Sequence, residues 1–205
     1  MVFPDIRKAP QTQCVRASAL LTSVLFNITT NGNAQLLAER LDGLVNDPSR
    51  LGMLLAAVYA VASLAQLVVG RLLDRFPMKP LFFGVLLLQI VAFGVASQTS
   101  GWIWYVAAIA YMVMVFGAIP FNDTMVVRYI DDAMRSRVSG TRIAISFGFS
   151  SIAVYLLGPV VKVAGFTQLM VALTCVAALG AIIVLFLPNE AQMNAHLKGG
   201  SSNHL

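Results

Sequence analysis

The sequence predicts an all-α, polytopic membrane protein, and three observations carry this prediction. Of the 205 residues, 58% are hydrophobic and only 11% are charged, and the mean hydropathy is +0.79. A soluble domain of this length needs a larger polar surface, because folding cannot hide every apolar side chain. Apolar runs of about 20 residues, the length that crosses the hydrocarbon layer of a bilayer, recur along the chain. We therefore expect a transmembrane helix bundle rather than a soluble all-α domain.

The expected bundle covers residues 17–187 and contains six transmembrane helices. The apolar runs place these helices at 17–38, 51–72, 81–99, 102–127, 139–163 and 166–187. The first is the weakest span because its second half is polar, and Pro120 is expected to bend the fourth. Residues 1–16 lack the apolar core of a signal peptide, so we expect the first helix to act as the insertion signal. Residues 188–205 are expected to form a disordered tail.

Basic residues predict the orientation of the bundle. Three of them fall on one side of the membrane: Arg40, Arg50 and Lys162. The others fall on the opposite side, together with both termini: Arg7, Lys8, Arg16, Arg71, Arg75, Lys79, Arg128, Arg135, Arg137, Arg142 and Lys198. Because the more basic side faces the cytoplasm, both termini should be cytoplasmic. The expected location is the cell membrane, which in a bacterium is the inner membrane.

Polar residues are concentrated on four of the six expected helices, the first, second, fourth and fifth. Several recur every fourth residue, which places them on one helix face: Asn27, Asn31 and Gln35; Tyr59, Ser63, Gln66 and Gly70; and Arg142, Ser146 and Ser150. The fourth helix carries Tyr111 and Asn122. Such residues either form hydrogen bonds between helices, worth about 0.6–2 kcal/mol each, or line a water-filled cavity. Four polar helices beside two apolar ones favour a shared cavity.

The segment from Gly70 to Phe82 gathers charged residues between two long apolar runs, so it should turn at the membrane surface. Its spacing, Gly70-x-x-x-Asp74-Arg75-x-x-x-Lys79, resembles the signature loop of the major facilitator superfamily of secondary transporters. That loop joins the second and third helices of a six-helix half, as it does here. A second block, residues 122–140, resembles the connection between the fourth and fifth helices of a carboxy-terminal half.

The resemblance implies one half of a twelve-helix fold, in which two halves alternate access to a site between them. It implies that the four polar helices line the solute path and that the third and sixth face lipid. Residues 1–16 resemble the end of the cytoplasmic linker between halves. A missing amino-terminal half, or a second copy of the chain, would then be required. This copy departs from the motif at Leu73, Pro77 and Met78, and Met78 replaces a basic residue.

Three groups of residues are candidate sites. In the family, the carboxylate matching Asp74 pairs with cations matching Arg75 and Lys79 to latch the cytoplasmic side; a solvated loop is the plainer alternative. Asp123 is the only carboxylate inside an expected span, so it serves either proton coupling or a structural ion pair with a nearby arginine such as Arg142. Other candidates for the solute path carry neutral polar groups: Asn27, Asn31, Gln35, Tyr59, Gln66, Tyr111 and Asn122.

Other functional classes are disfavoured. The net charge of +5 is explained by basic loops at a membrane, and no basic stretch is interleaved with aromatic residues as in a nucleic-acid binder. The only histidines, His196 and His204, lie in the tail, and Cys14 and Cys175 should lie at different depths. We therefore expect no enzyme, cofactor, metal site or disulfide. The alternative to a transporter is a six-helix scaffold or a partner half without transport activity of its own.

Overall fold

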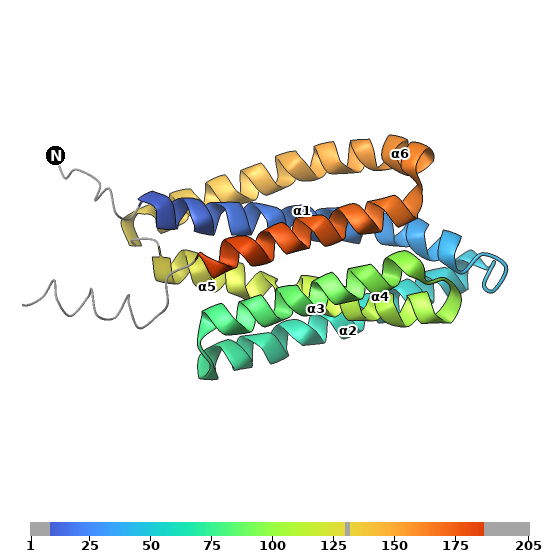
Figure 1. The fold of residues 1–205 in the computed structure, drawn as a ribbon, viewed down its shortest axis with the longest axis horizontal. Coiled ribbons are helices and arrows are strands. Elements are labelled where there is room, and N and C mark those ends of the chain that lie inside the picture. Colours follow the sequence, from blue (N-terminus) through green and yellow to red (C-terminus); the bar gives the residue numbers. More distant parts are fainter. Residues whose placement is uncertain (1–8, 130–131, 187–205) are drawn as a thin grey trace, which may run out of the picture.

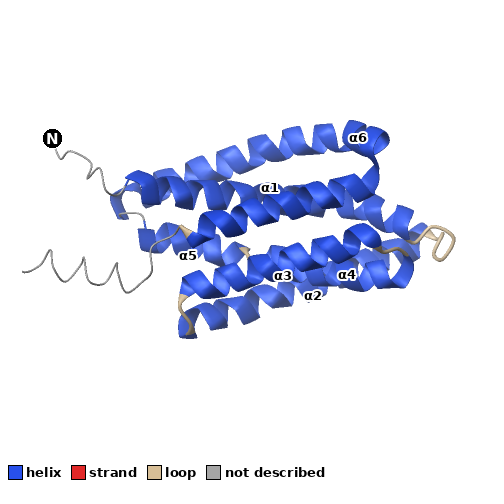
Figure 2. Ribbon diagram, viewed as in Figure 1, coloured by secondary structure: helices blue, strands red, loops and turns tan. Residues whose placement is uncertain are grey.

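The computed structural model describes residues 9–129 and 132–186, and every regular element within these ranges is a helix. The helices are α1 (Ala9–Arg40), α2 (Pro48–Arg75), α3 (Met78–Gln98), α4 (Gly101–Gly117), α5 (Ile119–Tyr129) and α6 (Asp132–Leu185). They run side by side in an elongated bundle, with the turns between antiparallel helices at its two ends and the α4–α5 break inside it (Figures 1 and 2). The all-helical prediction is confirmed.

Four described stretches are long and apolar enough to cross a membrane: Pro48–Arg75, Met78–Gln98, Gly101–Met125 and Gly158–Leu185. The first expected span, on α1, is not among them, which agrees with its polar second half. The stretch of α6 before Gly158 also falls outside this set. Both segments are nevertheless helical and run alongside the others (Figure 1).

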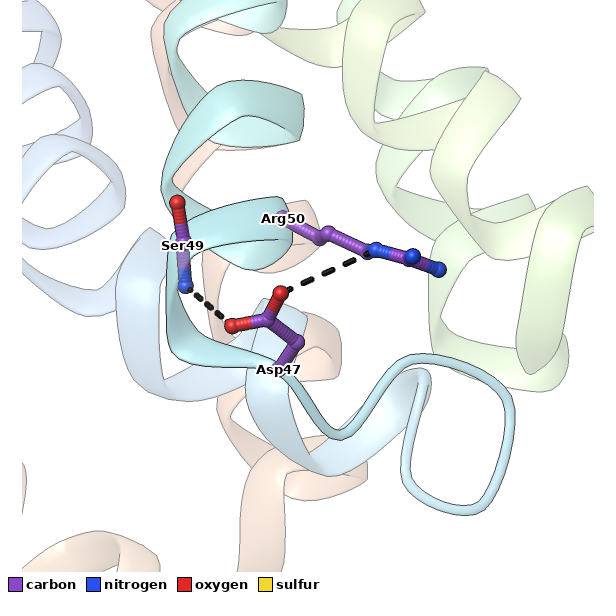
Figure 3. Close-up of polar contacts among 3 residues, drawn as sticks. All are labelled: Asp47, Ser49 and Arg50. Carbon is purple, nitrogen blue, oxygen red and sulfur yellow. Dashed lines mark hydrogen bonds and ion pairs between the residues drawn. The ribbon is translucent and has the colours of Figure 1, made fainter.

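The second helix begins with a well-formed cap. The Oδ1 atom of Asp47 accepts a hydrogen bond from the Ser49 amide at 3.0 Å, and Pro48 occupies the first turn, where its missing N–H costs nothing. Arg50 adds an exposed ion pair to Asp47 at 3.7 Å (Figure 3). At its other end α2 continues to Arg75, farther than expected.

The expected loop between the second and third helices is therefore mostly helix. Gly70, Asp74 and Arg75 lie in the last turns of α2, and only Phe76 and Pro77 separate α2 from α3. Arginine and leucine favour helix, and Pro77 is the first residue that stops it. The expected turn is present but shorter than predicted, because α2 ends three residues later and α3 begins three residues earlier than expected.

The fourth expected helix is divided, as Pro120 predicts. α4 ends at Gly117 and α5 begins at Ile119, and the Ala118 amide still donates to Met114 O at 3.0 Å. Pro120 has no amide hydrogen to continue this ladder, and its ring crowds the preceding turn. At Gly117 the chain passes close to α2, since a Cβ there would lie 3.2 Å from Cγ2 of Val69.

α6 consists of two helical arms that reverse direction at Gly165, whose φ of 77° and ψ of 163° suit glycine almost exclusively. The arms correspond to the expected fifth and sixth helices, but the first arm begins at Asp132 rather than near residue 139. Likewise α1 begins at Ala9 rather than near residue 17. Apolar runs mark the part of a helix that lipid surrounds, not the turns that extend beyond it.

Hydrogen bonds between distant residues define the two ends of the bundle. At the α1–α2 end, Arg40 donates from Nη2 to Thr167 Oγ1 at 2.7 Å and from Nη1 to Thr99 O at 3.3 Å. At the α2–α3 end, Lys79 Nζ donates to Leu185 O at 2.7 Å. Successive spans therefore alternate in direction, as the expected topology requires.

The core has two parts. One lies around Leu36, Phe93, Tyr111 and Met170, and joins α1, α2, α3, α4 and α6. The other, toward the α2–α3 end, includes Phe82 and Phe121, whose rings stack with centroids 4.7 Å apart.

Candidate functional site

A cavity of about 230 Å³ lies between α1, α5 and the first arm of α6. Its polar lining comes from α1 and α5, and its apolar lining from all three helices: Thr22, Ser23, Phe26, Asn27, Ile119, Asn122, Asp123, Ile143 and Phe147. Three of these residues, Asn27, Asn122 and Asp123, were candidates for the solute path from sequence. The structure therefore brings together candidates that lie about 95 residues apart in the chain.

The break between α4 and α5 places two of these side chains. Because the helix restarts at Ile119, the following residues Asn122 and Asp123 border this cavity. Asn122 is 7% exposed, and its Oδ1 has no hydrogen-bond partner among the described residues. A buried acceptor without a partner is costly, so this oxygen is suited to receive a hydrogen bond from a water or a solute. Asp123 is exposed and takes part in an interaction with the protein.

The polar line on α1, formed by Asn27, Asn31 and Gln35, turns from the cavity toward the outside of the bundle along the helix. Asn27 Nδ2 donates to Ser23 O and Asn31 Nδ2 donates to Asn27 O, both at 2.8 Å. Asn27 is half-buried at the cavity, whereas Asn31 and Gln35 are exposed. We expected the line to face the bundle interior or a water-filled cavity; in this chain its second half faces outward instead.

The buried face of α1 carries other polar residues that the sequence analysis did not single out: Ser18, Thr22, Thr29 and Asn33. The hydroxyl groups of Thr22 and Thr29 donate hydrogen bonds to backbone carbonyls one turn earlier in α1, at 2.9 and 2.7 Å. Asn33 instead reaches another helix. Thr22, Thr29 and Asn33 are spaced by seven and four residues and so share one helix face, but Asn27, Asn31 and Gln35 follow a helical spacing too, so spacing alone gave no signal for which face is buried.

Four residues form a polar junction between α1, α2 and α4: Thr30, Asn33, Tyr59 and Tyr111. The Tyr111 hydroxyl donates to Asn33 Oδ1, and the Tyr59 hydroxyl donates to Thr30 O at 2.7 Å. Tyr111 is fully buried, so its hydroxyl serves the contact between helices in this structure.

The remaining candidates lie elsewhere. Gln66 and Gly70 are half-buried on α2, and Asp74 and Arg75 are exposed near its end. Lys79 binds the last carbonyl of α6, as described above. The backbone of Arg142 belongs to α6, but its side chain lies outside the described residues. Among the residues that the structure describes, no three histidine, cysteine, aspartate or glutamate side chains come together as metal ligands.

Every residue that lines this cavity, and all of the described bundle from residue 17 on, falls within one family match. Residues 17–203 match the family model of the Major Facilitator Superfamily. The chain belongs to this superfamily. No curated protein matches the chain at a significant level.

Membership of the major facilitator superfamily agrees with the helical structure of the chain. A major facilitator protein is an integral membrane transporter built from helices, and the described part of this chain is helical and holds four strongly apolar stretches. A length of 205 residues fits a half-size chain. The cavity at the α4–α5 break combines neutral amides, one carboxylate and apolar walls, a lining that is typical of small-molecule sites.

Proposed function

We propose that this chain moves a small solute across the cell membrane by alternating access, as one half of a secondary transporter. The observation that carries the proposal is the cavity between α1, α5 and α6, which gathers Asn27, Asn122 and Asp123 in a chain of the major facilitator superfamily. The amides offer neutral hydrogen bonds, and Phe26 and Phe147 offer apolar contact. This lining suits a small solute that is partly polar and partly apolar.

The proposal includes the membrane arrangement expected from sequence. Six spans cross the cell membrane, both termini are cytoplasmic, and the α2–α3 end faces the cytoplasm. The segregation of Arg71, Arg75 and Lys79 from Arg40 and Arg50 to opposite ends of the bundle supports this orientation.

A second bundle completes the proposed transporter, either a separately encoded amino-terminal half or a second copy of this chain. Asn31 and Gln35 are exposed on α1, and polar side chains that face lipid are costly. A partner bundle would cover them and close the cavity from the open side. The same exposure also favours the second candidate function, a partner half or scaffold that has no transport activity of its own.

The motif residues are proposed to latch the α2–α3 end in one state. Lys79 supports this role because it ties the start of α3 to the carboxyl end of α6, where the helix dipole favours a cation. Gly70 lies in the last turns of α2, and Asp74 and Arg75 are exposed, where groups of a second bundle can reach them. A difference of a few kcal/mol is enough to shift the equilibrium between two conformational states of the transporter. A few charge pairs at this end can supply a difference of that size.

Asp123 is proposed as the coupling residue, with a structural ion pair as the alternative. In a transporting preparation, Asp123→Asn should abolish solute-linked proton movement, measured with a pH dye inside proteoliposomes. Asp42→Asn is the matched control, because Asp42 is exposed in the α1–α2 connection. Proton movement that persists in Asp123→Asn would assign Asp123 to the structural role.

Thiol accessibility tests alternating access without knowledge of the solute. Cys14 and Cys175 are free, so both are replaced by serine, and Asn27→Cys is labelled in native membrane vesicles with a membrane-impermeant maleimide. We expect labelling from each side of the membrane. Leu88→Cys, at a position that is 58% exposed on an apolar surface, should resist the reagent because a thiolate does not form in lipid.

Labelling of Asn27→Cys from one side only would contradict alternating access and favour the scaffold. The size of the purified chain in detergent then separates the partner hypotheses. A homodimer supports a second copy, whereas a monomer that labels from both sides in native membranes supports a separately encoded half.

A further inference from the structure

An apolar groove of about 300 Å³ lies between α2, α3 and α4, and it shares no lining residue with the cavity between α1, α5 and α6. Its walls come from the end of α2, the start of α3 and the end of α4: Val69, Leu72, Pro80, Leu81, Gly84, Val85, Leu88, Val113, Met114 and Gly117. The lining is almost wholly apolar, and all three helices are among the stretches apolar enough to cross a membrane. We call it the α2–α3–α4 groove.

Two glycines make the groove. A Cβ added at Gly84 would meet no atom within 4 Å, so the missing side chain leaves open space along α3. Gly117 lets α4 approach α2 so closely that a Cβ would lie 3.2 Å from Val69. The groove is thus a narrow trough between helices rather than a gap that neighbouring side chains fill.

Basic residues lie at one end of the groove. Leu72 lines the groove and Arg75 follows it one turn later on α2, so Arg75 lies beyond the lining, near the α2–α3 end of the groove. Arg71 lies one turn before Arg75 on the same helix, and both are exposed. Within the part of the chain that the structure describes, neither arginine forms an ion pair. Their positive charge is available to a ligand.

We propose that the α2–α3–α4 groove binds one anionic phospholipid, with an acyl chain in the groove and the phosphate at Arg75. An amphiphile with an apolar tail and a negative head matches a trough that is apolar along its length and basic at its end. Arginine suits this role because its fork of N–H donors matches the geometry of a phosphate. The site does not depend on the proposed transport function.

Lipid binding to the purified full chain in detergent tests the proposal. The chain is titrated with dioleoyl phosphatidylglycerol or dioleoyl phosphatidylcholine, and bound lipid is counted by native mass spectrometry. We expect one site that prefers the anionic lipid by about fivefold or more, the contribution of one basic residue near a phosphate. Equal binding of the two lipids would overturn the proposal.

Two variants locate the site. Gly84→Leu fills the open space and should abolish the tight site for both lipids, whereas Gly94→Leu on the same helix should not, because Gly94 also has open space but lies outside the groove. Arg75→Gln should remove the preference for phosphatidylglycerol, whereas Arg50→Gln, at the other end of α2, should retain it. An unchanged preference in Arg75→Gln, or a tight site that survives in well-folded Gly84→Leu, would refute the assignment.

Discussion

Tyr111 and Asn33 show how much a single polar contact decides inside this bundle. Tyr111 is fully buried, Asn33 is 2% exposed, and the hydroxyl of one donates to the amide oxygen of the other. The contact joins α4 to α1 beside Tyr59 of α2, so three helices share one polar junction. Removing one partner would leave the other buried without a hydrogen bond.

We expect Tyr111→Phe to lower the free energy of unfolding by about 1–2 kcal/mol, because Asn33 Oδ1 loses its donor while ring packing is kept. Reversible unfolding in mixed detergent micelles measures this loss. Tyr155→Phe is the control, since Tyr155 is 79% exposed and should be insensitive. An unchanged stability of Tyr111→Phe would mean that a water molecule replaces the hydroxyl.

At the scale of single residues, the sequence predicted which side chains share a face but not which face is buried. Asn27, Asn31 and Gln35 do follow one line on α1. Thr29 and Asn33 follow another, and that second line faces the core. Polarity alone could not separate the two, because both faces of α1 carry amides and hydroxyls. The buried line became visible only through the contacts of Asn33 and Tyr111.

The elements are interrupted at two positions, and each interruption has a local cause. Pro120 divides the fourth span because it cannot extend the hydrogen-bond ladder. Gly165 reverses α6 because its backbone lies in a region that side chains rarely tolerate. Both breaks direct neighbouring segments: one orients Asn122 and Asp123, and the other folds the second arm of α6 back against α3.

Gly165→Ala should therefore destabilise the chain by about 1–3 kcal/mol, the cost of placing a side chain in that backbone conformation. Gly94→Ala is the matched control: Gly94 lies inside α3 with open space around it, and alanine favours helix there. Thermal unfolding followed by circular dichroism compares the two. A loss in Gly94→Ala as large as that in Gly165→Ala would show that the backbone angle is not the cause.

The ends of the elements are held by cations whose roles differ. Arg40 joins three segments through Thr99 and Thr167, whereas Arg50 forms only an exposed pair with Asp47, its neighbour in sequence (Figure 3). We expect Arg40→Gln to cost about 1–3 kcal/mol, as hydrogen bonds from a charged group are lost. Arg50→Gln should have little effect, because exposed pairs contribute little. Equal urea midpoints for the two variants would contradict this distinction.

At the scale of elements, the sequence predicted the order of the helices and the bend at Pro120. It did not predict their ends. Asp74 and Arg75 were placed beyond the end of the second helix, yet nothing before Pro77 prevents the helix from continuing. Hydropathy reports where lipid surrounds a helix, whereas hydrogen bonding decides where the helix ends.

The whole molecule is an antiparallel bundle whose two ends differ in charge, and this difference predicts its orientation. In a background without Cys14 and Cys175, Arg75→Cys should resist a membrane-impermeant maleimide in intact cells and react after permeabilisation. Arg50→Cys should react in both cases. Both positions are exposed, so accessibility reports only the side of the membrane. Reaction of Arg75→Cys in intact cells would reverse the proposed orientation.

At the scale of the whole molecule, the sequence predicted that successive helices run in opposite directions. Arg40 meeting Thr167, and Lys79 meeting Leu185, confirm that alternate connections lie at alternate ends. The sequence did not predict that Asn31 and Gln35 point out of the bundle. A polar helix face indicates polar surroundings, but it does not indicate what provides them. Whether those surroundings belong to the same chain or to another depends on packing.

The unbroken length of α2 has a consequence for the membrane itself. Its 28 residues span about 42 Å at about 1.5 Å each, whereas the section between Arg50 and Arg71 spans about 31 Å. These two exposed arginines therefore mark a hydrophobic thickness close to that of an ordinary bilayer. The length of α2 is therefore matched to one bilayer thickness. In a thinner bilayer α2 must tilt, or its terminal apolar turns are exposed to water. The chain thus matches one range of lipid lengths, and lipid composition becomes a determinant of its stability.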